Sequence, residues 1–209
     1  MARRFEDAQS LDDFPTPPWA TRALIEHVLN NDPTLREQTC IEPACGRGYM
    51  AAALKEYFGQ VHSSDIHNYG YGCVRDFLSI DPNTKYDWLI TNPPFNLAES
   101  FIRKGLPKVK VGLAVLVRTM FIEGVGRHTR LFSEKPPSIV AQFSERVPIV
   151  RGRLDANASS ATGYAWLVWK TAAIDQTRLM WVPPCRKMLE KAADYPISGH
   201  CKKWLQDSL

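Results

Sequence analysis

The chain has 209 residues, of which 44% are hydrophobic and 23% charged, a composition typical of a globular protein with enough length for a full core. The longest apolar run, Gly112 to Val117, is too short to span a bilayer. Met1 to Asp7 contains two arginines but lacks the apolar stretch of a secretory signal, so we expect a cytoplasmic protein. The net charge of +4 is compatible with a polyanionic partner but does not establish one.

The five cysteines are scattered, and no two of them form a C-x-x-C pair. A structural zinc site needs such pairs, and a disulfide scaffold needs a higher density of cysteine. We therefore predict free thiols in a reducing compartment and no metal site.

The N-terminal part begins with a polar segment, residues 1–13, which we expect to be flexible. Three prolines then fall within four positions of Phe14 to Trp19 and favour an extended conformation. A helical stripe of apolar residues follows from about Trp19 to Leu29. We expect Thr16 to cap this helix, with Pro17 near its first turn.

Strand and helix patterns alternate from about residue 38 to 133, which predicts an α/β fold with a doubly wound, mostly parallel sheet. Gly59 is expected to close one of the helices as a C′ residue. The predicted strands lie at Cys40 to Cys45, Gln60 to Ile66, Tyr86 to Thr91 and Lys110 to Phe121, and the predicted helices at Tyr49 to Phe58 and Leu97 to Leu106.

The last third of the chain has a different pattern. Ser138 to Val150 and Tyr164 to Lys170 are strand-like and are joined by a long polar loop. Such a connection predicts a hairpin, so the sheet should end antiparallel. Met188 to Leu209 predicts a weak amphipathic helix with an uncertain end. We expect one domain, residues 14–209.

Residues that suit a nucleoside ligand follow the first strands. Glu42 to Gly48 leads into a glycine turn but matches neither G-x-G-x-x-G nor a P-loop. Asp65 lies about 20 residues further on, a position that accepts hydrogen bonds from ribose hydroxyls in nucleoside-binding α/β folds. The alternative for Asp65 is a carboxylate that caps a turn. Asp76 can accept from an adenine amino group, and Phe77 can pack on the base.

Asn92-Pro93-Pro94-Phe95 directly follows the apolar strand Tyr86 to Thr91. Neither proline can donate to a β-ladder and each fixes its own φ, so the strand ends there and Asn92 is held rigidly. A rigid amide next to an aromatic ring can hold a planar amino group and stack the ring that carries it. A simple turn that ends a strand is the alternative.

Taken in order, these motifs resemble the catalytic domain of the S-adenosylmethionine-dependent amino-methyltransferases, in particular the N6-adenine DNA class. The resemblance covers roughly residues 14–125. The Asn-Pro-Pro-Phe tetrapeptide is shared with RNA N6-adenine and some protein-glutamine methyltransferases. The small size, the Thr16 to Thr21 segment and Tyr164-Ala165-Trp166 are similar to short phage and prophage enzymes.

The resemblance implies a role for each matched residue. Asn92 and the Pro93 carbonyl would accept hydrogen bonds from the target amine, with Pro94 stiffening the loop and Phe95 stacking on the target base. S-adenosylmethionine would be bound at its methionine end by Thr16, Pro17, Glu42, Ala44, Cys45 and Gly46, at its ribose by Asp65 with Ile66 beside it, and at its adenine by Asp76 and Phe77.

Larger members of this family carry a separate target-recognition domain, for which this chain has no room. Short basic loops are the candidates for contact with DNA, or with RNA, and an ordinary solvated surface is the alternative. These loops contribute Arg118, Arg127, Arg130, Arg151 and Arg153. RNA adenine methylation, protein-glutamine methylation and a non-catalytic binding module remain the other readings of the sequence.

Overall fold

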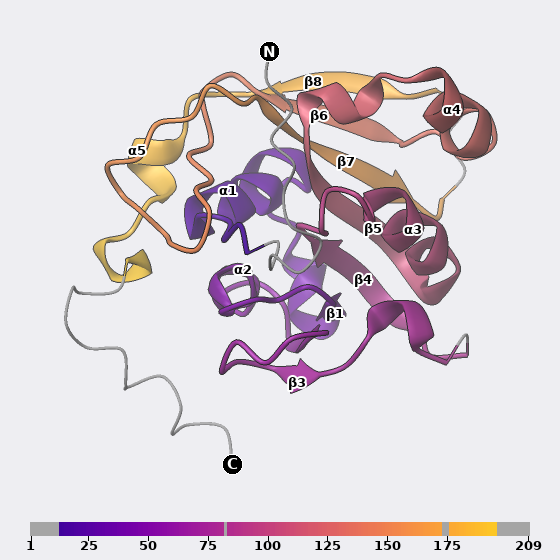
Figure 1. Cartoon of the computed structure of the whole chain (residues 1–209), viewed down its shortest axis with the longest axis horizontal. Helices are drawn as coiled ribbons and strands as arrows, with labels where there is room; N and C mark the ends of the chain where they lie inside the picture. Colours follow the sequence, from indigo (N-terminus) through magenta and orange to yellow (C-terminus); the bar gives the residue numbers. More distant parts are fainter. Residues whose placement is uncertain (1–12, 82, 173–175, 196–209) are drawn as a thin grey trace.

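In the computed structural model, residues 13–81, 83–172 and 176–195 are described. They contain one mixed sheet of eight strands in the order β3-β2-β1-β4-β5-β7-β6-β8 (Figure 1). The strands are β1 (Thr39–Glu42), β2 (Gln60–Asp65), β3 (Cys73–Val74), β4 (Tyr86–Thr91), β5 (Val109–Arg118), β6 (Ile139–Phe143), β7 (Tyr164–Lys170) and β8 (Arg178–Val182).

Strand direction confirms the predicted class of fold. β3, β2, β1, β4 and β5 pair in parallel, whereas β7 runs antiparallel to both β5 and β6. The predicted hairpin of β6 and β7 is therefore present. β8, which pairs in parallel with β6 at the edge of the sheet, was not predicted. Its polar start and the exposure of Leu179 and Trp181 hide the usual alternation of a half-buried strand.

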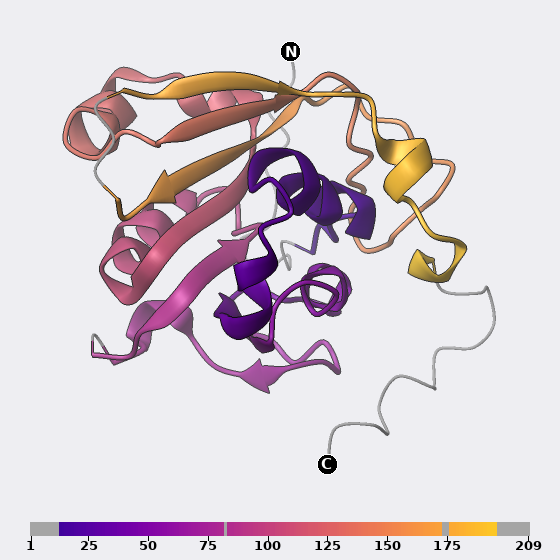
Figure 2. The same ribbon diagram turned by 180° about the vertical axis from the view of Figure 1, so that it is seen from behind.

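Helices cover both faces of the sheet, as the two opposite views show (Figures 1 and 2). α1 (Pro18–Ala23), its continuation η1 (Leu24–Val28) and α2 (Tyr49–Leu54) pack on one face. α3 (Ala98–Gly105) and η3 (Phe77–Ser79) pack on the other. The remaining short helices are η2 (Pro33–Glu37), η4 (Leu106–Lys108), η5 (Thr119–Ile122), α4 (Val125–Arg127), η6 (His128–Phe132), α5 (Arg186–Leu189) and η7 (Ala192–Asp194).

The core divides into two parts because successive strand residues point to opposite faces. On β5, Ala114 and Leu116 enter the part under α1, whereas Leu113, Val115 and Val117 enter the part under α3. All five of these side chains are buried, which explains why β5 is the most apolar segment of the sequence.

Two expectations about helix ends were wrong. Thr16 does not cap α1, because the N-cap residue is Pro17 and no side chain caps the helix by a hydrogen bond. Gly59 is not in the left-handed conformation of a C′ glycine. The structure instead requires glycine there for space, since a Cβ atom would lie 2.2 Å from the Arg36 carbonyl oxygen. Of the expected flexible segment, only Asp13 lies within the described residues, and residues 196–209 of the expected C-terminal helix lie outside them.

Candidate active site

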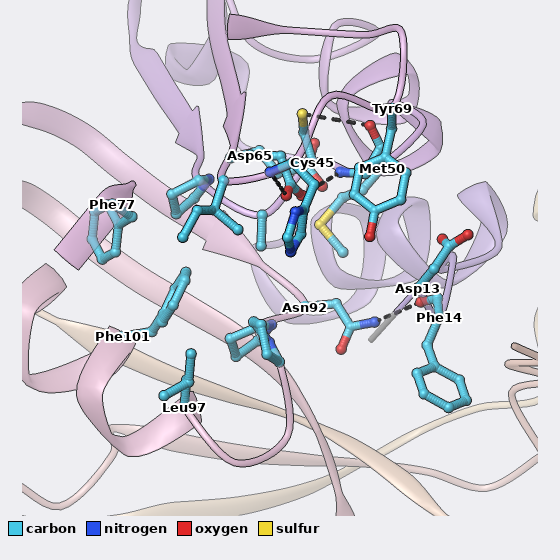
Figure 3. Close-up of a pocket in the computed structure, with 18 of the residues that line it drawn as sticks. Asp13, Phe14, Cys45, Met50, Asp65, Tyr69, Phe77, Asn92, Leu97 and Phe101 are labelled. Atoms are coloured by element: carbon cyan, nitrogen blue, oxygen red, sulfur yellow. Dashed lines mark hydrogen bonds between the residues drawn. The ribbon is translucent and has the colours of Figure 1, made fainter. Parts of the chain in front are cut away.

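A pocket of about 460 Å³ lies at the carboxyl ends of the central strands (Figure 3). Glu42 ends β1, Asp65 ends β2 and Asn92 directly follows β4, and these three strands are neighbours in the sheet. In open α/β sheets ligands bind at this edge, where the strand order reverses. The predicted site residues that line the pocket are Thr16, Glu42, Ala44, Cys45, Gly46, Asp65, Ile66, Asp76, Phe77, Asn92, Pro93, Pro94 and Phe95.

Pro17 is the one predicted pocket residue that does not line the cavity; it is buried at the start of α1. Phe77 lines the pocket but is only 1% exposed, and its ring packs on Phe101 with centroids 5.0 Å apart. Much of Phe77 therefore belongs to the core under α3, and only part of its surface is available to a ligand.

The turn after β1 is held open by backbone geometry. Gly46 and Gly48 have φ values of 51° and 83°, which side chains other than glycine rarely adopt. A Cβ atom at Gly48 would also lie 2.6 Å from the ring of Tyr71. The Cys45 N–H donates to the Ser64 carbonyl at 3.0 Å, which fixes the turn against β2. The turn thus presents backbone rather than side chains to the pocket.

Asp65 ties the loops after β1 and β2 together. Its Oδ2 accepts from the Gly46 N–H at 2.9 Å, and its Oδ1 accepts from the His67 N–H at 3.0 Å. Asp76 is bound in a similar way, with Oδ1 accepting from the Leu78 N–H and Oδ2 from the Ser79 hydroxyl. Both carboxylates therefore shape loops, and each oxygen keeps a second lone pair with which it can accept from a ligand.

Glu42 is 2% exposed, and its Oε2 has no hydrogen-bond partner among the described residues. Burial raises the pKa of Glu42 well above its usual value, and the neighbouring Asp65 raises it further. The hydroxyl of Thr16, which is 4% exposed, is likewise without a partner within the described chain. Buried polar atoms are nearly always satisfied in proteins, so this pair suggests a ligand that completes them.

Asn92 has one satisfied and one unsatisfied end. Its Nδ2 donates to the Phe14 carbonyl at 3.0 Å, whereas its Oδ1 is buried and unpartnered among the described residues. The amide is thus oriented with its acceptor spare (Figure 3). Because this oxygen is shielded from solvent, a ligand must displace a neighbouring group to reach it.

Phe95 lies between two other side chains. The Arg118 guanidinium carbon is 3.7 Å from the centroid of the Phe95 ring, and the ring of Phe14 lies 5.2 Å away at an interplanar angle of 49°. Phe14 and Phe95 line the pocket but Arg118 does not. The guanidinium therefore covers a part of the ring that faces away from the cavity, a cation–π contact that helps to hold the ring in place.

The other predicted basic residues lie outside the pocket lining. Arg127 donates to the Phe121 and Glu123 carbonyls, and Arg130 forms a two-pronged ion pair with Glu99. Arg151 and Arg153 flank Gly152, whose N–H donates at 2.8 Å to the carbonyl of Asp13, a pocket residue. The turn at 151–153 consequently lies at the rim of the pocket.

Sequence reasoning missed several residues of the pocket. Asp13 and Phe14 come from the N-terminal segment, Met50 from the start of α2, and His67 and Tyr69 from the loop after β2. The aromatic residue directly before the proline-rich segment was a usable signal for Phe14. No spacing or motif marked His67 or Tyr69, because loop residues lack periodicity.

Within the described ranges, no group of three or more His, Cys, Asp or Glu residues is placed to hold a metal ion. The same part of the chain contains no helix with the length and apolarity needed to cross a membrane. The thiols of Cys40 and Cys45 are buried and free, and burial, with a smaller effect of Glu42, raises the pKa of both.

No model of a known protein family matches this chain, and curated protein sequences offer no match either. Solved structures do. A methyltransferase subunit of the type I restriction-modification system from Streptococcus thermophilus is 14% identical with a TM-score of 0.61, over 88% of this chain and 50% of that one. A protein provisionally described as a type I restriction modification subunit from Vibrio vulnificus is 13% identical with a TM-score of 0.59, over 91% of this chain and 51% of that one.

A third structure, provisionally described as an RNA methyltransferase from Pyrococcus horikoshii, is 14% identical with a TM-score of 0.58, over 80% of this chain and 93% of that one. At such identities the similarity establishes the fold, which this chain shares with these methyltransferases. The chain spans about half the length of the two restriction-modification subunits.

Proposed function

We propose that this protein binds S-adenosylmethionine in the pocket and transfers its methyl group to the exocyclic N6 amine of an adenine in DNA. The observation that carries the proposal is the Asn92 side chain, whose nitrogen is tied to Phe14 and whose oxygen is left without a partner. An acceptor fixed at the carboxyl edge of the sheet is what an amine substrate requires.

The pocket suits the cofactor in size and charge. Its volume of about 460 Å³ lies within the usual range for small-molecule sites. Four carboxyl groups line it, those of Asp13, Glu42, Asp65 and Asp76. When bound, S-adenosylmethionine supplies a methyl group activated by a positively charged sulfonium, and both that charge and its ammonium group favour acidic surroundings. Glu42 and Thr16 would hold the methionine end, and Asp65 and Asp76 the nucleoside.

Asn92 and Pro93 would activate the target amine. The lone pair of adenine N6 is delocalised into the ring, so the amine is a poor nucleophile. Hydrogen bonds from its two N–H groups to Asn92 Oδ1 and the Pro93 carbonyl would favour a tetrahedral nitrogen and localise the lone pair. Alignment in the pocket supplies much of the remaining effect, and the proton can leave to solvent after transfer.

The target base must leave its stack to reach this site. Stacking on Phe95 would offset part of the cost of unstacking, at about 1–3 kcal/mol per base. The spare oxygen of Asn92 is shielded in the free protein, so the pocket must open slightly as the base enters. Arg118, Arg151 and Arg153 are the candidates for contact with the nucleic-acid backbone.

The test is methyl transfer from labelled S-adenosylmethionine to separate pools of double-stranded DNA, single-stranded DNA and RNA, followed by mass spectrometry of the nucleosides. We expect N6-methyl-deoxyadenosine. Label in N6-methyladenosine alone would assign the activity to RNA, and label in protein glutamine would exclude nucleic acid. A protein that does not bind S-adenosylmethionine in calorimetry would be a non-catalytic module, and the proposal would be wrong.

Substitution of Asn92 tests the chemistry. Asn92→Ala should bind cofactor normally but lose at least about two orders of magnitude in kcat, the usual loss when one preorganised hydrogen-bonding group is removed. Asn83→Ala is the matched control, because Asn83 is exposed and precedes β4 at the end opposite to Asn92. Near-normal turnover by Asn92→Ala would remove Asn92 from the mechanism.

A further inference from the structure

The N-terminal segment at Asp13 and Phe14 reaches the reacting end of the pocket although it lies 78 residues from Asn92 in the chain. It contacts Asn92 through the Phe14 carbonyl and Phe95 through the Phe14 ring. Figure 3 shows Phe14 beside Asn92, with the hydrogen bond between them. Sequence analysis treated Asp13 as part of a flexible segment and gave Phe14 no role in the site.

The hydrogen bond from Asn92 Nδ2 decides which way the amide points. An asparagine side chain carries an oxygen and an NH₂ group that can exchange places by rotation of the amide. The Phe14 carbonyl can only accept, so it selects the orientation in which Nδ2 faces it and Oδ1 faces away. The residue after Phe14 is a proline, so no N–H group at that peptide bond competes for the amide oxygen.

The position of the Phe14 carbonyl is itself fixed on several sides. The Asp13 carboxylate forms an ion pair with Arg47 at 3.0 Å. The Asp13 carbonyl accepts from the Gly152 N–H at 2.8 Å. The Phe14 ring is partly buried against the core and contacts Phe95 at 5.2 Å. These contacts come from the turn after β1, the loop before β7 and the loop after β4, so the segment is anchored to three separate parts of the site.

We propose that Phe14 is a positioning residue for methyl transfer, whose carbonyl orients the Asn92 amide so that its oxygen is presented to the target amine. The inference rests on the proposed function, but the orientation of the amide is a property of the free protein. It can therefore be measured without substrate, cofactor or activity.

The experiment combines NMR of the Asn92 side-chain amide with steady-state kinetics. The Asn92 NH₂ signals are identified by their loss in Asn92→Asp. In Phe14→Ala we expect these signals to shift and to exchange with solvent at least several-fold faster. The kcat should fall on the order of tenfold or more, as expected when a catalytic group is misplaced, with the Kd for S-adenosylmethionine changed less than about threefold. Phe14→Tyr, which keeps the ring, should restore both.

Two further variants keep the test decisive. Asp13→Ala removes the ion pair with Arg47 but leaves Phe14 in place, and it should show the same changes to a smaller extent. Phe132→Ala is the matched control, because Phe132 is also partly buried and packs on another phenylalanine, Phe121, outside the pocket lining. It should leave the Asn92 signals and kcat unchanged.

Unaltered Asn92 signals in a folded Phe14→Ala variant would overturn the positioning role. Altered signals with kcat unchanged would also overturn it, because the orientation would then have no consequence for the reaction. If the wild-type protein shows no methyl transfer to any substrate, the proposed function fails, and the NMR result still decides whether Phe14 orients the amide.

Discussion

Arg22 provides a quantitative test of what holds the C-terminal segment to the body of the protein. It lies on α1 with its side chain only 4% exposed, and it bonds to two carboxylates from distant parts of the chain. Glu56 follows α2, and Asp194 lies in η7 with its side chain 5% exposed. Arg22 also donates to the Leu189 carbonyl at 2.7 Å. Burial alone would lower the pKa of Arg22, but the hydrogen bonds to Asp194 and Glu56 more than offset this and raise it.

Asp194→Ala should lower the free energy of unfolding by about 3 kcal/mol. Asp194 accepts two hydrogen bonds from the Arg22 guanidinium, both at 2.7 Å. Each charged hydrogen bond contributes at least about 1.5 kcal/mol, and the loss of one partner of a buried ion pair costs about 3–5 kcal/mol. The lower end applies because Glu56 and the Leu189 carbonyl remain bound to Arg22. For a chain of this size the Tm should fall by about 6–12 °C.

The assay is urea unfolding followed by circular dichroism, with Tm from differential scanning fluorimetry. Lys191→Ala is the control, because Lys191 is 55% exposed and pairs with Glu56 without contacting the buried guanidinium. That exposed pair should contribute no more than about 1 kcal/mol. If Asp194→Ala lies within 1 kcal/mol of the wild type at an equal m-value, the network does not hold the segment in place and the reasoning is refuted.

Three further predictions concern the site. Asp65→Ala should raise the Kd for S-adenosylmethionine and, because it also frees two backbone N–H groups, cost about 1–3 kcal/mol of stability; unchanged affinity in calorimetry would contradict the ribose assignment. Burial, with the charge of Asp65, raises the pKa of Glu42, so the folded protein holds an extra proton between the unfolded and folded pKa values. The free energy of unfolding should therefore fall as pH rises through that window, and cofactor binding should release a proton, measured by calorimetry in buffers of different ionisation enthalpy; Glu42→Gln should abolish both effects. Replacing Arg151 and Arg153 together with serine should reduce the salt dependence of DNA binding by about two ions on a log–log plot, whereas Arg36→Ser, which changes an exposed side chain outside the pocket lining, should leave the slope unchanged.

Most of the fold was predictable because its elements carry local signals. The apolar run of β5 and the alternation of strands and helices predicted the parallel sheet, and the paired apolar segments predicted the β6–β7 hairpin. β8 escaped because an exposed edge strand with outward Leu179 and Trp181 lacks the alternation that marks a half-buried strand. Gly59 was misjudged because its requirement comes from Arg36, on another segment of the chain.

The sequence by itself determined which residues gather at the pocket, because parallel strands end at the same edge and each motif directly follows a strand. Glu42, Asp65 and Asn92 were located in this way. Only the tertiary structure decided how the groups are oriented. That Asn92 turns its nitrogen to Phe14, and that Asp65 spends both oxygens on loop backbone, depends on contacts between segments far apart in the chain. Periodicity and spacing describe one segment at a time and contain no information about such contacts.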